Sequence, residues 1–188
     1  MSPTRSEPTD PALPTVLVLA SGRGERFTAS GGTTHKLQAL LGGETVLSRT
    51  LAAVQASGLP WHLEERGLPG MGDSIAAAVA ATPKAHGWLI LPADLPLVRS
   101  DTLRAVAQSL VHHSVVVPVF EGQKGHPVGF AACCGPDLQN LEGNRGAAQV
   151  IIAWDAIELI VNDAGIRMDI DTVNDLADAE ALLCRPNE

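Results

Sequence analysis

Residues 87–97 have the sequence GWLILPADLPL, an apolar run followed by one carboxylate between two prolines. An apolar run of this length is typical of a buried strand. Pro92 and Pro96 then end the strand, because proline lacks an amide hydrogen and has a fixed φ. Asp94 therefore follows the carboxyl end of a central strand, which is where ligands bind in open α/β sheets. A carboxylate there suits a hard cation such as Mg²⁺, and the alternative is an Asp that caps a turn.

The size and composition of the chain predict one globular domain. It has 188 residues, of which 45% are hydrophobic. The formal net charge of −8 and the aromatic content of only 3% argue against a nucleic-acid partner. The three cysteines form no CxxC pair, which favours reduced thiols and a cytoplasmic protein. No segment of the sequence is long and apolar enough to predict a membrane span.

Apolar runs alternate with helical patterns along the chain. They predict strands at residues 15–20, 61–66, 87–91, 115–119, 126–132, 157–161 and 166–170. Helices are predicted at residues 45–57, 74–82, 101–112, 136–143 and 145–154, and after Thr172, which forms a capping box with Asp175. This alternation predicts an α/β fold with three layers around a mostly parallel sheet. Residues 1–13 are expected to be a disordered tail, because they are rich in Pro, Ser and Thr, and residues 14–188 a single domain.

A glycine-rich loop after the first predicted strand carries Arg23 and Arg26 and leads to Lys36. It matches neither of two common phosphate-binding loops. Phe27 stands where the dinucleotide fingerprint requires a small residue, and Lys36 is followed by Leu37 where the P-loop requires Ser or Thr. The amides of such a loop can still surround a triphosphate, and its cations can neutralise it. The alternative is a solvated surface loop.

Two further motifs place polar groups beside glycine. Residues 70–74, GMGDS, precede a helix, so Gly70 and Gly72 would let the backbone approach a ligand, and Ser74 could cap the helix or bind a sugar or base. Residues 124–127, KGHP, predict a turn that exposes His126. That histidine would face either solvent or an anionic group of an acceptor substrate.

Asp169 and Asp171 alternate at the end of the last predicted strand, so their carboxylates are expected to face one side. Two like charges on one face need a cation or solvent nearby. If this end of the chain lies beside Asp94, the three carboxylates form a magnesium site. The capping role of Thr172 explains part of the same sequence without any function.

Taken in order, these motifs resemble one family, the nucleotidyltransferases related to molybdenum cofactor cytidylyltransferase and its guanylyltransferase relatives. The resemblance runs from Val16 to about Leu183. The stretches that carry it are LASGRGER at 19–26, KL at 36–37, GMGDS at 70–74, PADLP at 92–96, GHP at 125–127 and DIDT at 169–172.

The resemblance implies a Rossmann-like nucleotidyltransferase fold and an enzyme that needs Mg²⁺. The implied reaction transfers a nucleotidyl group, most often CMP from CTP, to molybdopterin with release of pyrophosphate, and a molybdoenzyme or its chaperone is a further implied partner. The implied catalytic residues are Lys36 and Asp94. The implied nucleotide-binding residues are Gly22, Arg23, Gly24, Arg26, Lys36, Gly70, Gly72 and Ser74. The implied acceptor-binding residue is His126, and the implied metal ligands are Asp94, Asp169 and Asp171.

Two other hypotheses stay open at the level of sequence. Only about ten residues separate Leu59 from Gly70, on the side of the cleft that should surround the base. A non-catalytic chaperone that binds the cofactor or nucleotide with a degenerate base site is therefore one alternative. The motifs do not specify the acceptor, so nucleotidyl transfer to another phosphorylated small molecule is the other.

Overall fold

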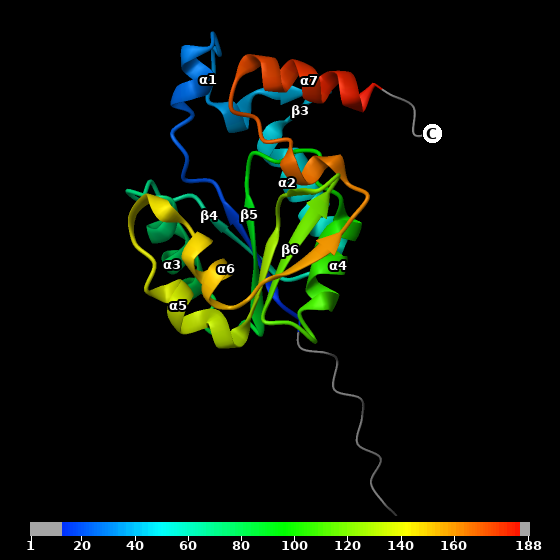
Figure 1. Cartoon of the computed structure of the whole chain (residues 1–188). Helices are drawn as coiled ribbons and strands as arrows, with labels where there is room; N and C mark the ends of the chain where they lie inside the picture. Colours follow the sequence, from blue (N-terminus) through cyan, green and yellow to red (C-terminus); the bar gives the residue numbers. More distant parts are fainter. Residues whose placement is uncertain (1–12, 185–188) are drawn as a thin grey trace, which may run out of the picture.

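The computed structural model describes residues 13–184. Apart from Leu13, the predicted tail at residues 1–13 lies outside this range. The described chain forms a seven-stranded central sheet with the order β4-β1-β5-β8-β6-β7, and β9 pairs with β6 (Figure 1). A separate small hairpin joins β2 (Leu40–Leu41) and β3 (Glu44–Thr45).

Five strands of the main sheet point in one direction. They are β4 (Trp61–Glu64), β1 (Thr15–Leu19), β5 (Gly87–Pro92), β6 (Val115–Phe120) and β9 (Ile157–Ile160). Only β8 (Val128–Ala131), between β5 and β6, and the short β7 (Gln123–Lys124) run the other way. The predicted mostly parallel sheet is therefore confirmed. Leu19 pairs with Pro92, so the carboxyl ends of β1 and β5 lie side by side.

Alternate side chains of the strands enter two separate cores, which makes the fold three-layered. Val16 and Val18 of β1 pack on one face with α2 (Val46–Ser57) and α4 (Ser100–Ser109). Leu17 and Leu19 pack on the other face with α3 (Met71–Ala81), α5 (Gly135–Gln139) and α6 (Ala148–Ala153). Figure 1 shows α2 and α4 on one side of the sheet and α3, α5 and α6 on the other. Both cores are aliphatic, as the composition predicts.

The remaining helical segments are short, except for α7. They are α1 (Glu25–Ala29), α7 (Val173–Leu183) and the 3₁₀ helices η1 (Lys36–Gln38), η2 (Ala132–Cys134), η3 (Gly143–Arg145) and η4 (Ala164–Arg167). The predicted capping box at Thr172 and Asp175 is confirmed. Within residues 13–184 every cysteine is a free thiol, and no helix is long and apolar enough to cross a membrane.

The predicted strand at residues 166–170 is wrong. Ile166 and Ile170 are fully buried, as the pattern indicates, but they lie in η4 and in the extended segment that follows it. The buried Asp163 carboxylate causes the turn, because it accepts hydrogen bonds from the Gly165 amide and from the Arg99 amide and the Thr102 hydroxyl of α4. The predicted helix at 74–82 also begins earlier, at Met71, and the predicted helix at 145–154 divides into η3 and α6.

Candidate active site

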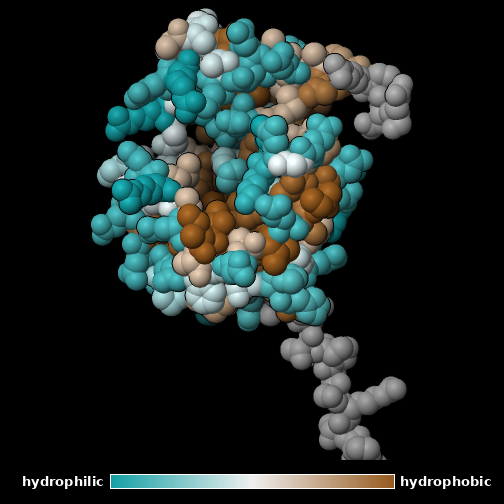
Figure 2. All heavy atoms as spheres, viewed as in Figure 1, coloured by the Kyte–Doolittle hydropathy of each residue, from teal (hydrophilic) through white to brown (hydrophobic). Residues whose placement is uncertain are grey.

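A cleft of about 910 Å³ opens at the carboxyl ends of β1 and β5. Residues 19–26 of the β1–α1 loop, residues 68–71 before and at the start of α3, and residues 124–126 line it, together with Lys36, Asp94, Asn144 and residues of the segment from η4 to Asp171. Figure 2 shows the surface hollowed beneath the α1 end of the molecule, with hydrophilic side chains around the hollow. The structure brings most of the predicted site residues to this cleft: Gly22, Arg23, Gly24, Arg26, Lys36, Gly70, Asp94, His126, Asp169 and Asp171.

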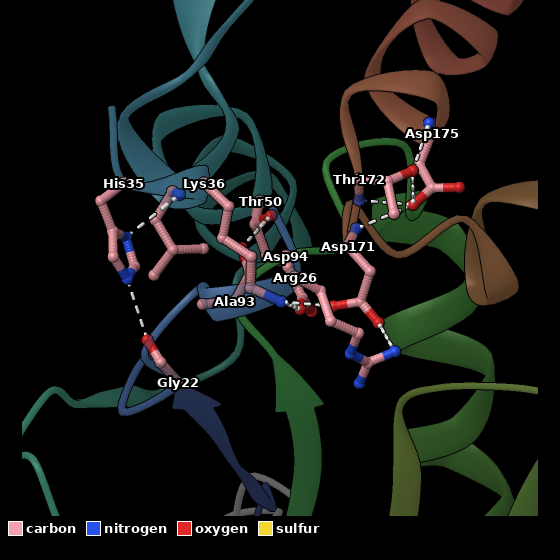
Figure 3. A network of polar contacts seen from close by, with 11 residues as sticks. Gly22, Arg26, His35, Lys36, Thr50, Ala93, Asp94, Asp171, Thr172 and Asp175 are labelled. Carbon is pink, nitrogen blue, oxygen red and sulfur yellow. Dashed lines mark hydrogen bonds and ion pairs between the residues drawn. The ribbon is translucent and has the colours of Figure 1, made fainter. Parts of the chain in front are cut away.

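Lys36 lies at the centre of an ion-pair network (Figure 3). Its Nζ is 2.5 Å from Asp94 Oδ2 and 2.7 Å from Asp171 Oδ1. The other Asp171 oxygen is 2.7 Å from Nη1 of Arg26. Burial opposes the charge on Lys36, but the two carboxylates outweigh burial and hold the Lys36 pKa above its ordinary value. Burial likewise opposes the charge on Asp171, yet Lys36 and Arg26 hold the Asp171 pKa below its ordinary value. Lys36 and Asp171 are therefore charged at neutral pH.

The main chain around Asp94 is fixed from three sides. The Ala93 amide donates to Leu19 O at 3.0 Å, which extends the contact between β1 and β5. The Thr50 hydroxyl of α2 donates to Ala93 O at 2.9 Å, and the Ile170 amide donates to Asp94 O at 2.9 Å. Because the Asp94 side chain pairs with Lys36 in a cleft, the alternative of an Asp that caps a turn is wrong.

His35 is a structural residue of the loop that the sequence motifs did not reveal. Its Nε2 lies 2.9 Å from Gly22 O, and its Nδ1 accepts a hydrogen bond from the Leu37 amide at 3.3 Å. An accepting Nδ1 places the ring proton on Nε2, which then donates to Gly22 O. His35 thereby ties the glycine-rich loop to η1 and so to Lys36. The only signal in the sequence is its position next to Lys36.

His126 is half-buried beside the cleft, so the predicted exposed turn is wrong. Its backbone amide donates to Ile166 O at 2.9 Å, which joins the segment before β8 to η4. Burial lowers the His126 pKa, so the imidazole is neutral at pH 7. Its Nδ1 is buried and has no hydrogen-bond partner among the described residues. The hydrogen-bonding capacity of this atom is therefore unsatisfied within residues 13–184.

The predicted three-carboxylate metal site is not preformed. Within residues 13–184, no group of three or more His, Cys, Asp or Glu side chains is placed to hold a metal ion. The physical reason is that Lys36 engages Asp94 and Asp171, and Arg26 engages the second Asp171 oxygen. Asp171 is thus an anchor for two cations in this structure.

One carboxylate oxygen does fit a divalent cation. Asp94 Oδ1 is buried and accepts no hydrogen bond from any residue between 13 and 184. Mg²⁺ at nucleotide sites commonly takes one or two carboxylates and completes its shell with phosphate oxygens and water. Asp169 is the second candidate, because burial and then the neighbouring Asp171 and Asp94 charges raise its pKa, and a cation would relieve that repulsion.

Gly72 and Ser74 do not line the cleft, which corrects their prediction as direct nucleotide contacts. Ser74 is fully buried, and its hydroxyl donates to Gly70 O at 3.0 Å and lies 2.7 Å from Ser21 Oγ. It supports the β1–α1 loop from behind. A side chain at Gly72 would place its Cβ 2.8 Å from Glu142 O. Gly72 is thus a close contact with another segment of the chain.

The short connection between β4 and α3 is organised by one buried carboxylate. Glu64, at the end of β4, is 1% exposed. It accepts hydrogen bonds from the Arg66 amide at 3.0 Å and from the Arg66 side chain at 2.9 and 2.5 Å. These bonds from Arg66 hold the Glu64 pKa below its ordinary value. The Glu64 carbonyl accepts the Ala20 amide at 2.8 Å, so the connection is joined to the start of the glycine-rich loop.

Residues 51–157, more than half of the chain, match the family model of the MobA-like NTP transferase domain. The chain belongs to this family. Nucleotidyltransferase is thus the enzyme class of its family, and the resemblance and the Rossmann-like fold predicted from the sequence are confirmed.

Two curated relatives of this MobA-like chain have different names. It is 31% identical over 116 residues to the purine catabolism protein PucB of Bacillus subtilis. That alignment covers 59% of this chain and 56% of that protein. It is 27% identical over 111 residues to the molybdenum cofactor cytidylyltransferase of Escherichia coli. That alignment covers 59% of this chain and 57% of that protein. The match thus spans less than two thirds of either relative.

The crystal structure of Rv0371c from Mycobacterium tuberculosis is similar over 92% of this chain and 100% of that chain, with a TM-score of 0.78 and 23% identity. A second structure of that protein is a complex with manganese, with a TM-score of 0.73 and 22% identity, covering 90% of this chain and 98% of that chain. At these identities the likeness shows the fold that the MobA-like chain shares with them.

Proposed function

We propose that this protein is a metal-dependent nucleotidyltransferase, and that it transfers CMP from CTP to molybdopterin. The observation that carries the proposal is Lys36, which is held between Asp94 and Asp171 at the floor of a cleft whose rim is a glycine-rich loop. A buried cation next to loop amides is suited to bind a triphosphate. The E. coli relative named molybdenum cofactor cytidylyltransferase supports the choice of CTP and molybdopterin.

The reaction forms one bond and breaks one. An oxygen of the acceptor's terminal phosphate attacks the α-phosphorus of CTP, and the bond from the α-phosphorus to the bridging oxygen of the β-phosphate breaks. Pyrophosphate leaves with the electron pair of that bond. The protein needs to align the two phosphates and neutralise their charge, and no covalent intermediate is required.

Each part of the cleft has a role in this scheme. The amides of residues 22–26 surround the β- and γ-phosphates, with the exposed side chains of Arg23 and Arg26 at the mouth. Lys36 stabilises the charge that develops on the α-phosphate. Asp94 and Asp169 would hold the metal ion, which when bound supplies further neutralisation of the phosphate charge. Asp171 keeps Lys36 and Arg26 directed toward the phosphates.

His126 belongs to the acceptor side of the cleft in this proposal. Lys124, His126 and Arg167 line the cleft, and β7, which carries Lys124, lies at the opposite end of the sheet order from β4. A neutral imidazole contributes a hydrogen bond to an acceptor phosphate, and the two cations contribute charge. The cytoplasmic location, the molybdoenzyme partner and the extent of the domain to residue 188 stay predictions from the sequence.

A second candidate function keeps the chemistry and changes the acceptor. The similarity to a relative named purine catabolism protein favours it, because that name does not refer to molybdopterin. Transfer to another phosphorylated small molecule would use the same glycine-rich loop, Lys36 and Asp94.

Pyrophosphate release from each of the four NTPs, with Mg²⁺ and with or without molybdopterin, tests the proposal. We expect release with CTP and molybdopterin, together with a labelled cytosine dinucleotide product. Asp94→Asn should abolish release, whereas Asp101→Asn, an exposed carboxylate of α4 outside the cleft, should not change it. Release with another phosphorylated acceptor only would favour the second candidate. No release under any combination would refute a transferase.

A further inference from the structure

The two ends of the cleft differ in chemistry on either side of Lys36. The end beside β4 is lined by Leu68, Pro69 and Met71, which present apolar surface, and by the polar side chains of Ser21 and Asn144. The opposite end is lined by Lys124, His126 and Arg167. A flat heterocycle fits an apolar wall with a few hydrogen-bonding groups, whereas a phosphorylated acceptor fits a cationic wall. This contrast favours the β4 end for the base of the nucleotide.

We propose that residues 142–145 form the base-selecting wall of this cleft, and that the Asn144 side-chain amide is the group that distinguishes one nucleobase from another. The proposal rests on the proposed function as a nucleotidyltransferase. Residues 142–145 lie about seventy positions after the short connection at 65–70. They supply from a distant part of the chain the surface that this short connection is too small to provide.

The wall is docked on α3 by close backbone contacts. A Cβ at Gly70 would lie 2.3 Å from the carbonyl carbon of Gly143, and one at Gly72 would lie 2.8 Å from Glu142 O. Such distances leave space only for glycine. The Asp73 carboxylate accepts a hydrogen bond from the Gly143 amide at 3.1 Å. Gly70 and Gly72, which the sequence predicts as nucleotide contacts, thus position the wall together with Asp73.

Asn144 is suited to base selection by its chemistry and its place. Its amide offers both a donor and an acceptor, which a base edge can pair with. It lies beside apolar residues of the cleft, so a bound base would cover it, and a base edge that does not match the amide would then leave buried groups without hydrogen-bond partners. Its Oδ1 lies 2.8 Å from where a Cβ on Gly70 would be, so the amide lies against Gly70 at the edge of the cleft.

The test compares selectivity in three variants. Equilibrium binding of the α,β-methylene analogues of all four NTPs, with Mg²⁺, gives the ratio of affinities for the preferred base and the next. Asn144→Ala should lower that ratio about 10-fold, the effect of one hydrogen bond to a discriminating group. Asp73→Ala should lower it in the same direction, because the Gly143 amide loses its acceptor. Asn140→Ala is the matched control, an exposed asparagine of the same connection outside the cleft, and should leave the ratio unchanged.

Each outcome decides one question. Unchanged unfolding temperature with a lower ratio supports the wall, because Asn144 is exposed and its loss costs little stability. An Asn144→Ala variant that weakens all four analogues equally overturns the inference, as does a wild-type protein with no preference among them. In both cases the proposed function can still stand, since pyrophosphate release tests it separately. Preferential binding by the wild type that is lowered in Asn144→Ala, without turnover, would refute the transferase and support the wall as a selective binding site.

Discussion

The phosphate side and the base side of the cleft are held together by different forces. On the phosphate side, Arg26, Lys36, Asp94 and Asp171 form ion pairs of 2.5 to 2.7 Å. On the base side, close glycine contacts and the hydrogen bond from the Gly143 amide to the Asp73 carboxylate join residues 70–73 to residues 142–143. Within the connection before α3, Glu64 is bonded to Arg66 and Ser74 to Gly70. The side chains of the phosphate side can exchange their ion-pair partners for a charged ligand. The backbone segments of the base side are packed too closely to shift without a clash.

The difference follows from what each side binds in the proposed reaction. A triphosphate and a cation bring charges that exchange with the existing ion pairs, so Lys36 can leave a carboxylate for a phosphate without becoming unpaired. A nucleobase brings only shape and a few hydrogen bonds. Discrimination between bases then requires a rigid wall whose backbone does not move to accept the wrong base. The comparison predicts that the phosphate side controls rate and the base side controls stability and selectivity.

The largest expected effect is on rate, from Lys36→Met. Loss of a buried cation directed at a developing phosphate charge should lower kcat/KM about 10³-fold, equivalent to about 4 kcal/mol. Steady-state pyrophosphate release measures it. Lys84→Met, a change at an exposed lysine outside the cleft, is the matched control. Equal activity of the two variants would contradict the prediction that the phosphate side of the cleft controls rate.

The next effect is on stability, from Gly72→Ala in α3. In most helices this change stabilises by about 1 kcal/mol, since alanine has the higher helix propensity. Here the new Cβ would meet Glu142 backbone atoms at 2.8 to 3.0 Å. The expected result is therefore destabilisation of about 1–3 kcal/mol, as for overpacked sites. Urea unfolding measures it against Gly67→Ala, where a Cβ would have no neighbour within 4 Å in residues 13–184. A stabilised Gly72→Ala variant would show that the Glu142 backbone moves away to accept the new Cβ, so that the wall is not rigid.

A smaller effect is expected from Ser74→Ala. The variant removes the hydroxyl that bonds Gly70 O and contacts Ser21, a loss of about 1 kcal/mol for a buried hydrogen bond. Ser48→Ala, at an exposed position in α2, should cost nothing measurable. NTP binding by Ser74→Ala should weaken by less than its stability falls, because the hydroxyl does not line the cleft. A selective loss of nucleotide affinity at unchanged stability would restore Ser74 as a direct contact.

The sequence predicted the phosphate side better than the base side, for a physical reason. Lys36, Asp94 and Asp171 each follow a local signal, a glycine-rich loop, a strand ended by proline, or a helix cap, and parallel strands bring such signals to one edge. The predicted strand at residues 166–170 is the exception, and its cause is also local. The apolar residues Ile166 and Ile170 are buried as predicted, but the Asp163 carboxylate turns the chain into η4 instead of a strand.

The base side depends on contacts between distant segments. Gly70 and Gly72 carry a visible signal of close approach, but the sequence does not indicate that the approaching group is Gly143 or Glu142. The sequence likewise gives no signal for the hydrogen bond between Ser21 and Ser74, which lie 53 residues apart. For the same reason the sequence showed a short connection at 59–70 without showing what closes the cleft beside it.

The smallest expected effect concerns the ion pair between Glu64 and Arg66 on the base side. Arg66 lowers the pKa of the buried Glu64 below its ordinary value of 4.5, so the pair stabilises the fold when Glu64 is ionised. This contribution is present above about pH 4.5 and is lost as the pH falls through the lower pKa of the folded state. The stability of Arg66→Met should therefore fall below that of the wild type at pH 7, and the gap should close toward pH 3. Because Arg66 is largely exposed, 1 M salt should also narrow the gap at pH 7. Urea unfolding across this pH range measures both trends, and a gap independent of pH and salt would mean that this contact, like the rest of the base side, acts through shape alone.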